Sequence, residues 1–169
     1  MSLDSLYEAL RAEDGLLGEL ACKPAEEATG PSQLAARGPR IDPRGADYEL
    51  LLEMILEGSR LHYGSATVVR TRDRDLELLL GDQLYAMGLA RLAALDDLDA
   101  VAELADLISL VAQANAAGER ELADAAWHAS ATAIGWGPST EHEAAKASAR
   151  AGDASATSAL RRASLRVAQ

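Results

Sequence analysis

Apolar residues, mostly leucine and alanine, recur every three or four positions along most of the chain, which is the period of an amphipathic helix. The clearest stripes cover residues 46–66, 73–95 and 97–116, and weaker stripes cover residues 2–20 and 119–134. No segment alternates apolar and polar residues for long enough to predict a sheet. The sequence therefore predicts an all-α fold, a helical bundle of about five to seven helices.

Two segments depart from this helical pattern. Residues 22–45 contain four of the five prolines and three glycines, which predicts an extended connection or a mobile loop within the domain. Residues 141–169 are rich in alanine and serine, with Gly152 near the middle, which predicts either two short helices (140–151 and 154–168) or a partly flexible tail. We therefore expect a single helical domain over residues 1–140, followed by this C-terminal tail.

A pair of glycines predicts how two of the helices pack. Gly81 and Gly88 are seven residues apart, so on a helix they lie about 20° apart on one face. Each glycine inside a helix costs about 1 kcal/mol relative to alanine, so a pair on one face suggests that a neighbouring backbone comes close. The expected neighbour is the helix over 46–66, which has Gly58 near its middle. Close packing is the favoured interpretation, and the floor of a ligand pocket is the alternative.

Charge excludes one class of partner. The formal net charge is −11, and such a field repels nucleic acid. Residues 141–169 nevertheless carry a net charge of +2, so the rest of the chain carries −13. This basic tail either contacts the acidic body or is simply solvated, and solvation is favoured.

Location follows from two further features. No apolar run approaches the length of a membrane span. Residues 1–20 lack the pattern of a signal peptide, and the single cysteine, Cys22, is expected to be a free thiol. We expect a cytoplasmic protein.

The residues show no familiar catalytic or metal-binding pattern. His62, His128 and His142 lack the spacing of a metal site. The acidic run around Asp97 lies between two predicted helices, where aspartate usually caps a helix start rather than binding magnesium. Phosphate-binding loops, nucleophile elbows and dinucleotide fingerprints are absent from the sequence. We predict no catalytic residue, no metal site and no cofactor.

Residues from about 50 to 117 resemble the middle of the trans-isoprenyl diphosphate synthases, the all-α polyprenyl synthetase family. Residues 53–62, Glu-Met-Ile-Leu-Glu-Gly-Ser-Arg-Leu-His, resemble the family helix that ends in Leu-Ile-His before the first aspartate-rich motif. Residues 79–84, Leu-Leu-Gly-Asp-Gln-Leu, resemble the Gly-Asp-x-Leu helix, and Gln113 falls where the family often has Gly-Gln. The resemblance implies an isoprenoid-synthase-like partial bundle. The possible ligand-facing or close-packing positions are Gly58, His62, Gly81, Asp82, Gly88 and Gln113.

Departures from the family pattern point away from catalysis. Where the family has Asp-Asp-x-x-Asp, whose carboxylates hold magnesium, this chain has Tyr63, Gly64 and Thr67. The second aspartate-rich motif is also missing from the last 50 residues. The resemblance therefore implies a relative that has lost prenyl transfer, an accessory or regulatory subunit that forms a hetero-oligomer with a catalytic prenyl synthase.

A second hypothesis needs no prenyl connection. The chain is then a self-associating helical bundle, a homo-oligomer with a structural role or one in binding a small apolar ligand. In one version of this hypothesis, a pocket for an isoprenoid lies between the helices over 46–66 and 73–95.

Overall fold

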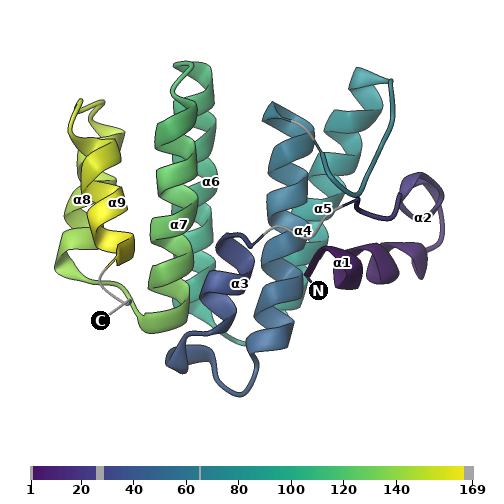
Figure 1. Ribbon diagram of the computed structural model, residues 1–169, viewed down its shortest axis with the longest axis horizontal. Helices are drawn as coiled ribbons and strands as arrows, with labels where there is room; N and C mark the ends of the chain where they lie inside the picture. The colour runs from purple at the N-terminus through teal and green to yellow at the C-terminus, as the bar shows by residue number, and fades with distance from the viewer. Residues whose placement is uncertain (1, 26–28, 65, 166–169) are drawn as a thin grey trace. The chain divides into compact units, whose positions relative to one another are not determined.

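The structure is a computed structural model, and it describes residues 2–25, 29–64 and 66–165. These residues form nine α-helices and one 3-10 helix (Figure 1). Within the described residues, the only β-bridge is an isolated antiparallel one between Ala21 and Val69. The all-α prediction is confirmed, although the described helices outnumber the five to seven expected. The end of the helix predicted over 154–168 lies outside the described residues.

The chain divides into two compact units. Unit 1 comprises residues 1–32 and 46–96, and unit 2 comprises residues 33–45 and 97–169. The sequence predicts one domain up to residue 140 and a separate tail. The division instead follows Asp96, which has a positive φ of 56°, and the C-terminal segment belongs to unit 2.

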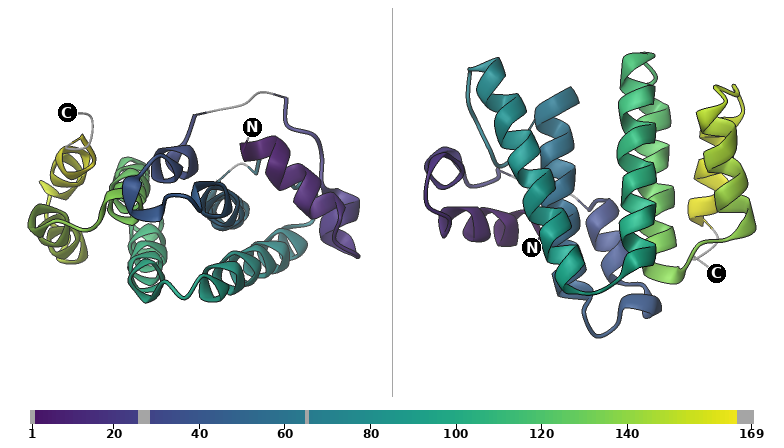
Figure 2. Two further views of the ribbon diagram at one scale, coloured as in Figure 1. Left: turned by 90° about the horizontal axis from the view of Figure 1, so that it is seen from below. Right: turned by 180° about the vertical axis from the view of Figure 1, so that it is seen from behind.

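Unit 1 consists of four helices around a leucine-rich core. They are α1 (Ser2–Arg11), α2 (Leu16–Leu20), α4 (Gly45–Tyr63) and α5 (Arg74–Ala94). Leu6, Leu17, Met54 and Leu84, one from each helix, belong to a single buried cluster, and α1 and α2 lie beside α4 and α5 (Figure 2). The helix predicted over 2–20 is interrupted because Gly15 adopts a φ of 97°, which only glycine accepts readily.

Glycines allow α4 and α5 to approach closely. A Cβ atom on Gly58 would lie 2.9 Å from the carbonyl oxygen of Gly81. A Cβ atom on Gly88 would lie 2.5 Å from Cγ1 of Ile55 and 2.9 Å from the carbonyl oxygen of Leu51. The two helices are therefore in contact at these glycines, where there is no room for a ligand between them.

Unit 2 is built around α7. Its helices are most of α3 (Pro31–Ala36), the 3-10 helix η1 (Pro39–Ile41), α6 (Leu98–Ala116), α7 (Arg120–Trp136), α8 (Thr140–Arg150) and α9 (Ala156–Leu165). Helix α7 packs against α6, α9 and η1, and α8 packs against α9 (Figure 1). Most buried residues of α7 are alanine, serine or glycine, so these neighbours can lie close to its backbone.

The prediction that residues 22–45 form only a loop is wrong, because α3 and η1 lie within this segment. Pro31 is the first residue of α3, a position at which the missing amide hydrogen is not needed. Gly38 precedes η1 and lies directly against the backbone of Gly135 in α7. This close contact explains how so short and proline-rich a segment is held in place.

An aspartate caps the start of α5 and another caps the start of α6. The Asp73 carboxylate accepts hydrogen bonds from the amides of Asp75 and Leu76 at the start of α5. The Asp97 carboxylate accepts one from the amide of Ala100 at the start of α6. The capping role expected of the acidic run is thus confirmed for Asp97. Among the described residues, no helix combines the length and the apolar character that crossing a membrane requires.

The contact between α4 and α5 predicts the effect of one substitution. Gly88→Ala should lower the free energy of unfolding by about 1–3 kcal/mol, because the added methyl group clashes with Ile55 and Leu51. Alanine favours a helix more than glycine does, so a decrease in the free energy of unfolding would come from the packing clash. Urea denaturation followed by circular dichroism measures it. Gly64→Ala is the control, because a Cβ atom there meets nothing closer than 3.9 Å. If Gly88→Ala and Gly64→Ala had equal free energies of unfolding, the close approach of α4 and α5 at Gly88 would be contradicted.

Candidate functional site

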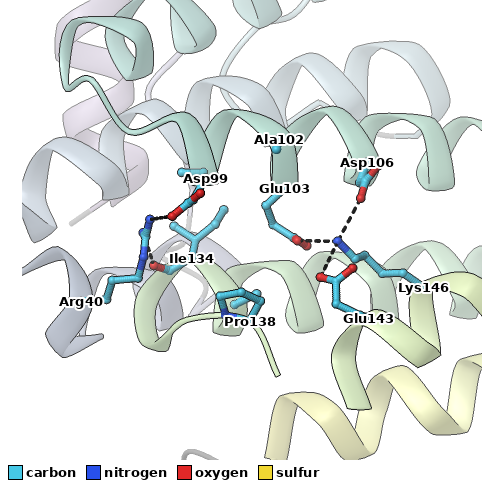
Figure 3. A pocket seen from close by; sticks show the side chains of 11 residues that line it. Arg40, Asp99, Ala102, Glu103, Asp106, Ile134, Pro138, Glu143 and Lys146 are labelled. Atoms are coloured by element: carbon cyan, nitrogen blue, oxygen red, sulfur yellow. Dashed lines mark hydrogen bonds and ion pairs between the residues drawn. The ribbon is translucent and has the colours of Figure 1, made fainter. Parts of the chain in front are cut away.

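A buried lysine in unit 2 is surrounded by three carboxylates. The side chain of Lys146, on α8, is only 3% exposed. Its Nζ atom lies 2.7 Å from Oε2 of Glu103, 2.9 Å from Oδ2 of Asp106 and 3.0 Å from Oε1 of Glu143. Figure 3 shows these three side chains converging on the ammonium group. Because Lys146 is so deeply buried, its charge needs these partners.

Glu103, on α6, is the centre of the cluster. Its Oε1 atom accepts hydrogen bonds from the Ser130 hydroxyl, at 2.6 Å, and from Nε2 of His142, at 2.8 Å. Its Oε2 atom accepts the bond from Lys146. The carboxylate thus joins α6 to Ser130 on α7 and to two residues of α8 that are four positions apart. We name Glu103, Asp106, Ser130, His142, Glu143 and Lys146 the Lys146 cluster.

Basic residues of the C-terminal segment pair with acids elsewhere in unit 2. Besides Lys146, Arg150 lies 2.7 Å from Oδ2 of Asp106, and Arg161 lies 2.9 Å from Oε2 of Glu121. The sequence favours a solvated tail. This expectation is wrong for Lys146, whereas Arg150 and Arg161 form ion pairs at the surface and stay 45% and 56% exposed. Helices α8 and α9 pack within unit 2, so their cations reach the acids of α6 and α7.

The cluster shifts the pKa values of its members. Burial alone would raise the pKa of Glu103, but hydrogen bonds from His142, Lys146 and Ser130 outweigh burial and hold it below its ordinary value. Burial also opposes the shift at Asp106, where Lys146 and Arg150 hold the pKa below its ordinary value. Burial disfavours the charged form of Lys146, yet the three carboxylates raise its pKa. The lysine is therefore protonated and fully paired, so it is a poor nucleophile or base.

A cavity of about 310 Å³ extends from the cluster towards Arg40 (Figure 3). Arg40 follows Pro39 in η1, and its guanidinium binds both carboxylate oxygens of Asp97, at 2.6 and 3.0 Å, and the carbonyl oxygen of Ile134, at 3.0 Å. This side chain ties η1 to the start of α6 and to the end of α7. The cavity therefore has ion pairs at both ends and alanine, isoleucine and proline between them.

A second buried carboxylate lies in unit 1. Oε1 of Glu57, on α4, accepts hydrogen bonds from the amides of Thr67, Val68 and Val69, at 2.6–2.9 Å. Its Oε2 atom accepts bonds from the Thr67 hydroxyl, at 2.7 Å, and from Arg60, at 3.4 Å. Both oxygens of Glu57 are thereby used to hold the segment between α4 and α5.

Glu53, one turn earlier on α4, is also paired. Its Oε1 atom lies 3.1 Å from the guanidinium of Arg60, and its Oε2 atom accepts a hydrogen bond from Ser32. The guanidinium of Arg60 therefore contacts both buried glutamates of α4.

Four of the six positions singled out in the sequence meet where α4 passes α5. Gly58 faces Gly81, and a Cβ atom on Gly81 would lie 2.8 Å from the ring of His62. Nε2 of His62 is 3.1 Å from Oδ1 of Asp82, and the ring stacks on Tyr85 with centroids 5.3 Å apart. Burial raises the pKa of Tyr85 to about 12.

The other two positions lie elsewhere. Gly88 contacts α4 farther along α5. Gln113 belongs to unit 2, where its amide group donates to the carbonyl oxygens of Ala149 and Arg150 at the end of α8. Gln113 is therefore in a different unit from the other five positions.

Sequence reasoning missed Glu103, Lys146 and Glu57. One signal was available: His142 and Lys146 are four residues apart, and Glu103 and Asp106 are three apart, so each pair shares a face of its helix. Glu57 also directly follows three apolar residues of α4, Met54, Ile55 and Leu56. Their partners come from other segments, which the spacing along one helix does not reveal.

Comparison of the chain with family models, with curated proteins and with solved structures gives no match.

The lowered pKa values of Glu103 and Asp106 predict how stability depends on pH. Because folding lowers both values, their stabilisation is present above the ordinary carboxyl pKa of about 4 and is lost as the pH falls through the folded values. Glu103→Gln should lower the free energy of unfolding by about 2–4 kcal/mol at pH 7, because it leaves Lys146 incompletely paired. The difference from the wild type should shrink towards pH 3.

Urea denaturation at the two pH values measures this effect. Glu143→Gln is the matched control: its side chain contacts the same lysine but is 55% exposed, so its loss should cost less than about 1 kcal/mol at pH 7. The cluster would not have the assigned role if the two variants lost equal stability, or if the Glu103→Gln difference did not change with pH.

Proposed function

We propose that the chain is a non-catalytic helical protein that serves as an accessory or regulatory subunit and pairs with a catalytic prenyl synthase. The resemblance over residues 50–117 motivates the proposed partner. In this segment Tyr63, Gly64 and Thr67 stand where the family has the aspartates of its first magnesium-binding motif. None of the three offers a carboxylate to a metal ion.

The observation that carries the proposal is the engagement of Glu57. It is the fully buried carboxylate of α4 nearest to the motif position, and its oxygens accept hydrogen bonds from Thr67, Val68, Val69 and Arg60. Magnesium that bridges a diphosphate needs carboxylate oxygens open to the ion. Glu57 instead fixes the backbone of the very segment that carries the catalytic aspartates in the family. This supports a structural use of the segment.

Exposed apolar side chains in unit 1 offer a surface for a partner. Leu79 on α5 is 61% exposed, and Tyr63 at the end of α4 is 41% exposed. Gln83 and Ala86 are exposed at the fourth and seventh positions after Leu79, on a face of α5 that also carries the exposed carboxylate of Asp82. We name Leu79, Gln83 and Ala86 the outer face of α5.

Self-association of the chain is the alternative, because the same outer face suits a second copy as well as another protein. The version with an apolar ligand between α4 and α5 is less favoured, since Gly58 and Gly88 hold these helices together. The two remaining hypotheses differ in the partner that they require.

Co-expression with a catalytic prenyl synthase encoded in the same genome separates them. We expect the two chains to elute together in size-exclusion chromatography. Leu79→Glu should weaken the complex at least about tenfold, because it places a charge at an apolar contact. Leu98→Glu is the matched control, since Leu98 is an exposed leucine of unit 2, 76% accessible, at the start of α6, where an acid suits the helix.

Light scattering on the separated fractions measures the molar mass of each species and so distinguishes the two hypotheses. A homodimer of this chain, with the synthase eluting alone, would overturn the accessory-subunit proposal in favour of self-association. If this chain elutes as a monomer and does not bind the synthase, both the accessory-subunit and the self-association hypotheses are overturned. Release of diphosphate by the isolated chain from allylic and homoallylic substrates with magnesium would overturn the non-catalytic assignment.

A further inference from the structure

Two arginines precede a serine near the end of α9. Residues 160–165 read Leu-Arg-Arg-Ala-Ser-Leu, so Ser164 has arginine at the third and second positions before it and leucine directly after it. No other serine or threonine of the sequence has arginines at both of these positions. Such a pattern suits a serine kinase whose substrate cleft is lined with carboxylates, because guanidinium groups bind carboxylates through two parallel hydrogen bonds. A pattern this short carries weight only where the folded chain exposes it.

The folded chain exposes both arginines, Arg161 and Arg162. Within the described part of the chain, Arg162 pairs with no carboxylate, and its guanidinium hydrogen-bonds only to the hydroxyl of Ser158, at 3.4 Å. Arg161 pairs with Glu121, but these two side chains are 56% and 80% exposed. Surface pairs of this kind contribute about 0–1 kcal/mol, so the pair yields readily to a stronger partner. Both guanidinium groups are therefore accessible to an acidic cleft.

The serine itself lies at the surface. Ser164 is half-buried, and its Oγ atom donates an exposed hydrogen bond of 2.8 Å to the carbonyl oxygen of Arg161. The residue borders an open cavity of about 340 Å³ between α7 and α9, and Leu165, directly after it, is 67% exposed. Ser164 also belongs to the last turn of α9. Helix ends fray because their last carbonyls lack partners within the helix, so this turn can open and enter a kinase cleft.

We propose that Ser164 is a phosphorylation site for a basophilic serine kinase, which recognises the guanidinium groups of Arg161 and Arg162 and the apolar side chain of Leu165. The Oγ atom of Ser164 attacks the γ-phosphorus of ATP, and the bond from that phosphorus to the bridging oxygen breaks. The hydroxyl proton passes to the catalytic aspartate of the kinase, and ADP leaves. The proposal concerns α9 and does not depend on the prenyl synthase partner.

Phosphorylation at this position acts on the packing of α9 against α7. A phosphate group adds a charge of about −1.5 to −2 at pH 7. In the last turn of α9 this charge meets the negative end of the helix dipole, and Asp124 of α7 borders the same cavity. The modification also removes the hydrogen bond from the Ser164 hydroxyl to Arg161. The last turn of α9 is therefore expected to loosen.

Phosphate transfer to the purified, folded chain tests the proposal. The probe is cyclic-AMP-dependent protein kinase, a basophilic serine kinase, with Mg²⁺ and ATP, and intact mass spectrometry counts the phosphates. We expect one phosphate per chain, and Ser164→Ala should abolish the transfer. Ser158→Ala is the matched control, because Ser158 is an exposed serine of the same helix without arginines at the two preceding positions. This control should accept phosphate as the wild type does.

A variant of an arginine tests the recognition. Arg162→Gln should lower kcat/KM for the transfer at least about tenfold, because it removes one of the two guanidinium groups. Arg120→Gln is the matched control, because Arg120 is an exposed arginine of the same unit, at the start of α7, and it should leave kcat/KM unchanged.

Hydrogen exchange tests the effect on the structure. The amides of residues 160–165 should exchange faster in the phosphorylated chain than in the unmodified chain, whereas those of α6 should not change.

Three results would overturn the proposed site: no transfer to the folded wild type; transfer that survives Ser164→Ala; or equal kcat/KM for the wild type and Arg162→Gln. If phosphorylation leaves the exchange of residues 160–165 unchanged, the loosening of α9 is contradicted.

Discussion

The buried ammonium group of Lys146 joins α8 to α6 within unit 2. Helix α8 is rich in alanine and offers little apolar surface of its own, and two of its four buried side chains are His142 and Lys146. Their contacts with Glu103 take the place of the leucine contacts that join most helices. Removing one member of a buried ion pair costs about 3–5 kcal/mol, so the position of α8 depends on this charge balance.

Unit 1 uses a buried glutamate in a comparable way. Glu57 holds a non-helical segment through three successive amides, and Glu103 holds α8 through two side chains, His142 and Lys146, while also accepting a bond from Ser130 of α7. In both units the carboxylate lies on a long helix and accepts hydrogen bonds from a later part of the chain. A carboxylate whose bonds are complete is not free to bind a substrate ion. This is why we favour roles in assembly over catalysis.

The sequence alone predicted those features that depend on neighbouring residues in one helix. The apolar stripes located α4 to α7 to within a few residues, and Asp97 was correctly expected to cap a helix. The glycine spacing pointed to the contact between α4 and α5, because a helix fixes the relative direction of residues seven apart. The segment over 22–45 was harder, since Gly38 is held by Gly135, nearly a hundred positions later.

The candidate site could not be predicted, because its partners are distant in sequence. Glu103 and Lys146 are 43 residues apart, and no periodicity links them. The basic residues after position 141 were expected to be solvated, whereas packing of α8 on α6 and α7 buries one of them. The division into two units also escaped prediction, because Asp96 and Asp97 look like an ordinary turn between helices.

Amine modification tests the central claim most directly. The chain has two lysines, and a reagent such as acetic anhydride, followed by mass spectrometry of the peptides, compares them in one sample. Exposed Lys23 should react readily, whereas Lys146 should stay unmodified in the folded protein and react after addition of denaturant. Equal modification of Lys146 and Lys23 under native conditions would contradict a buried, triply paired ammonium group.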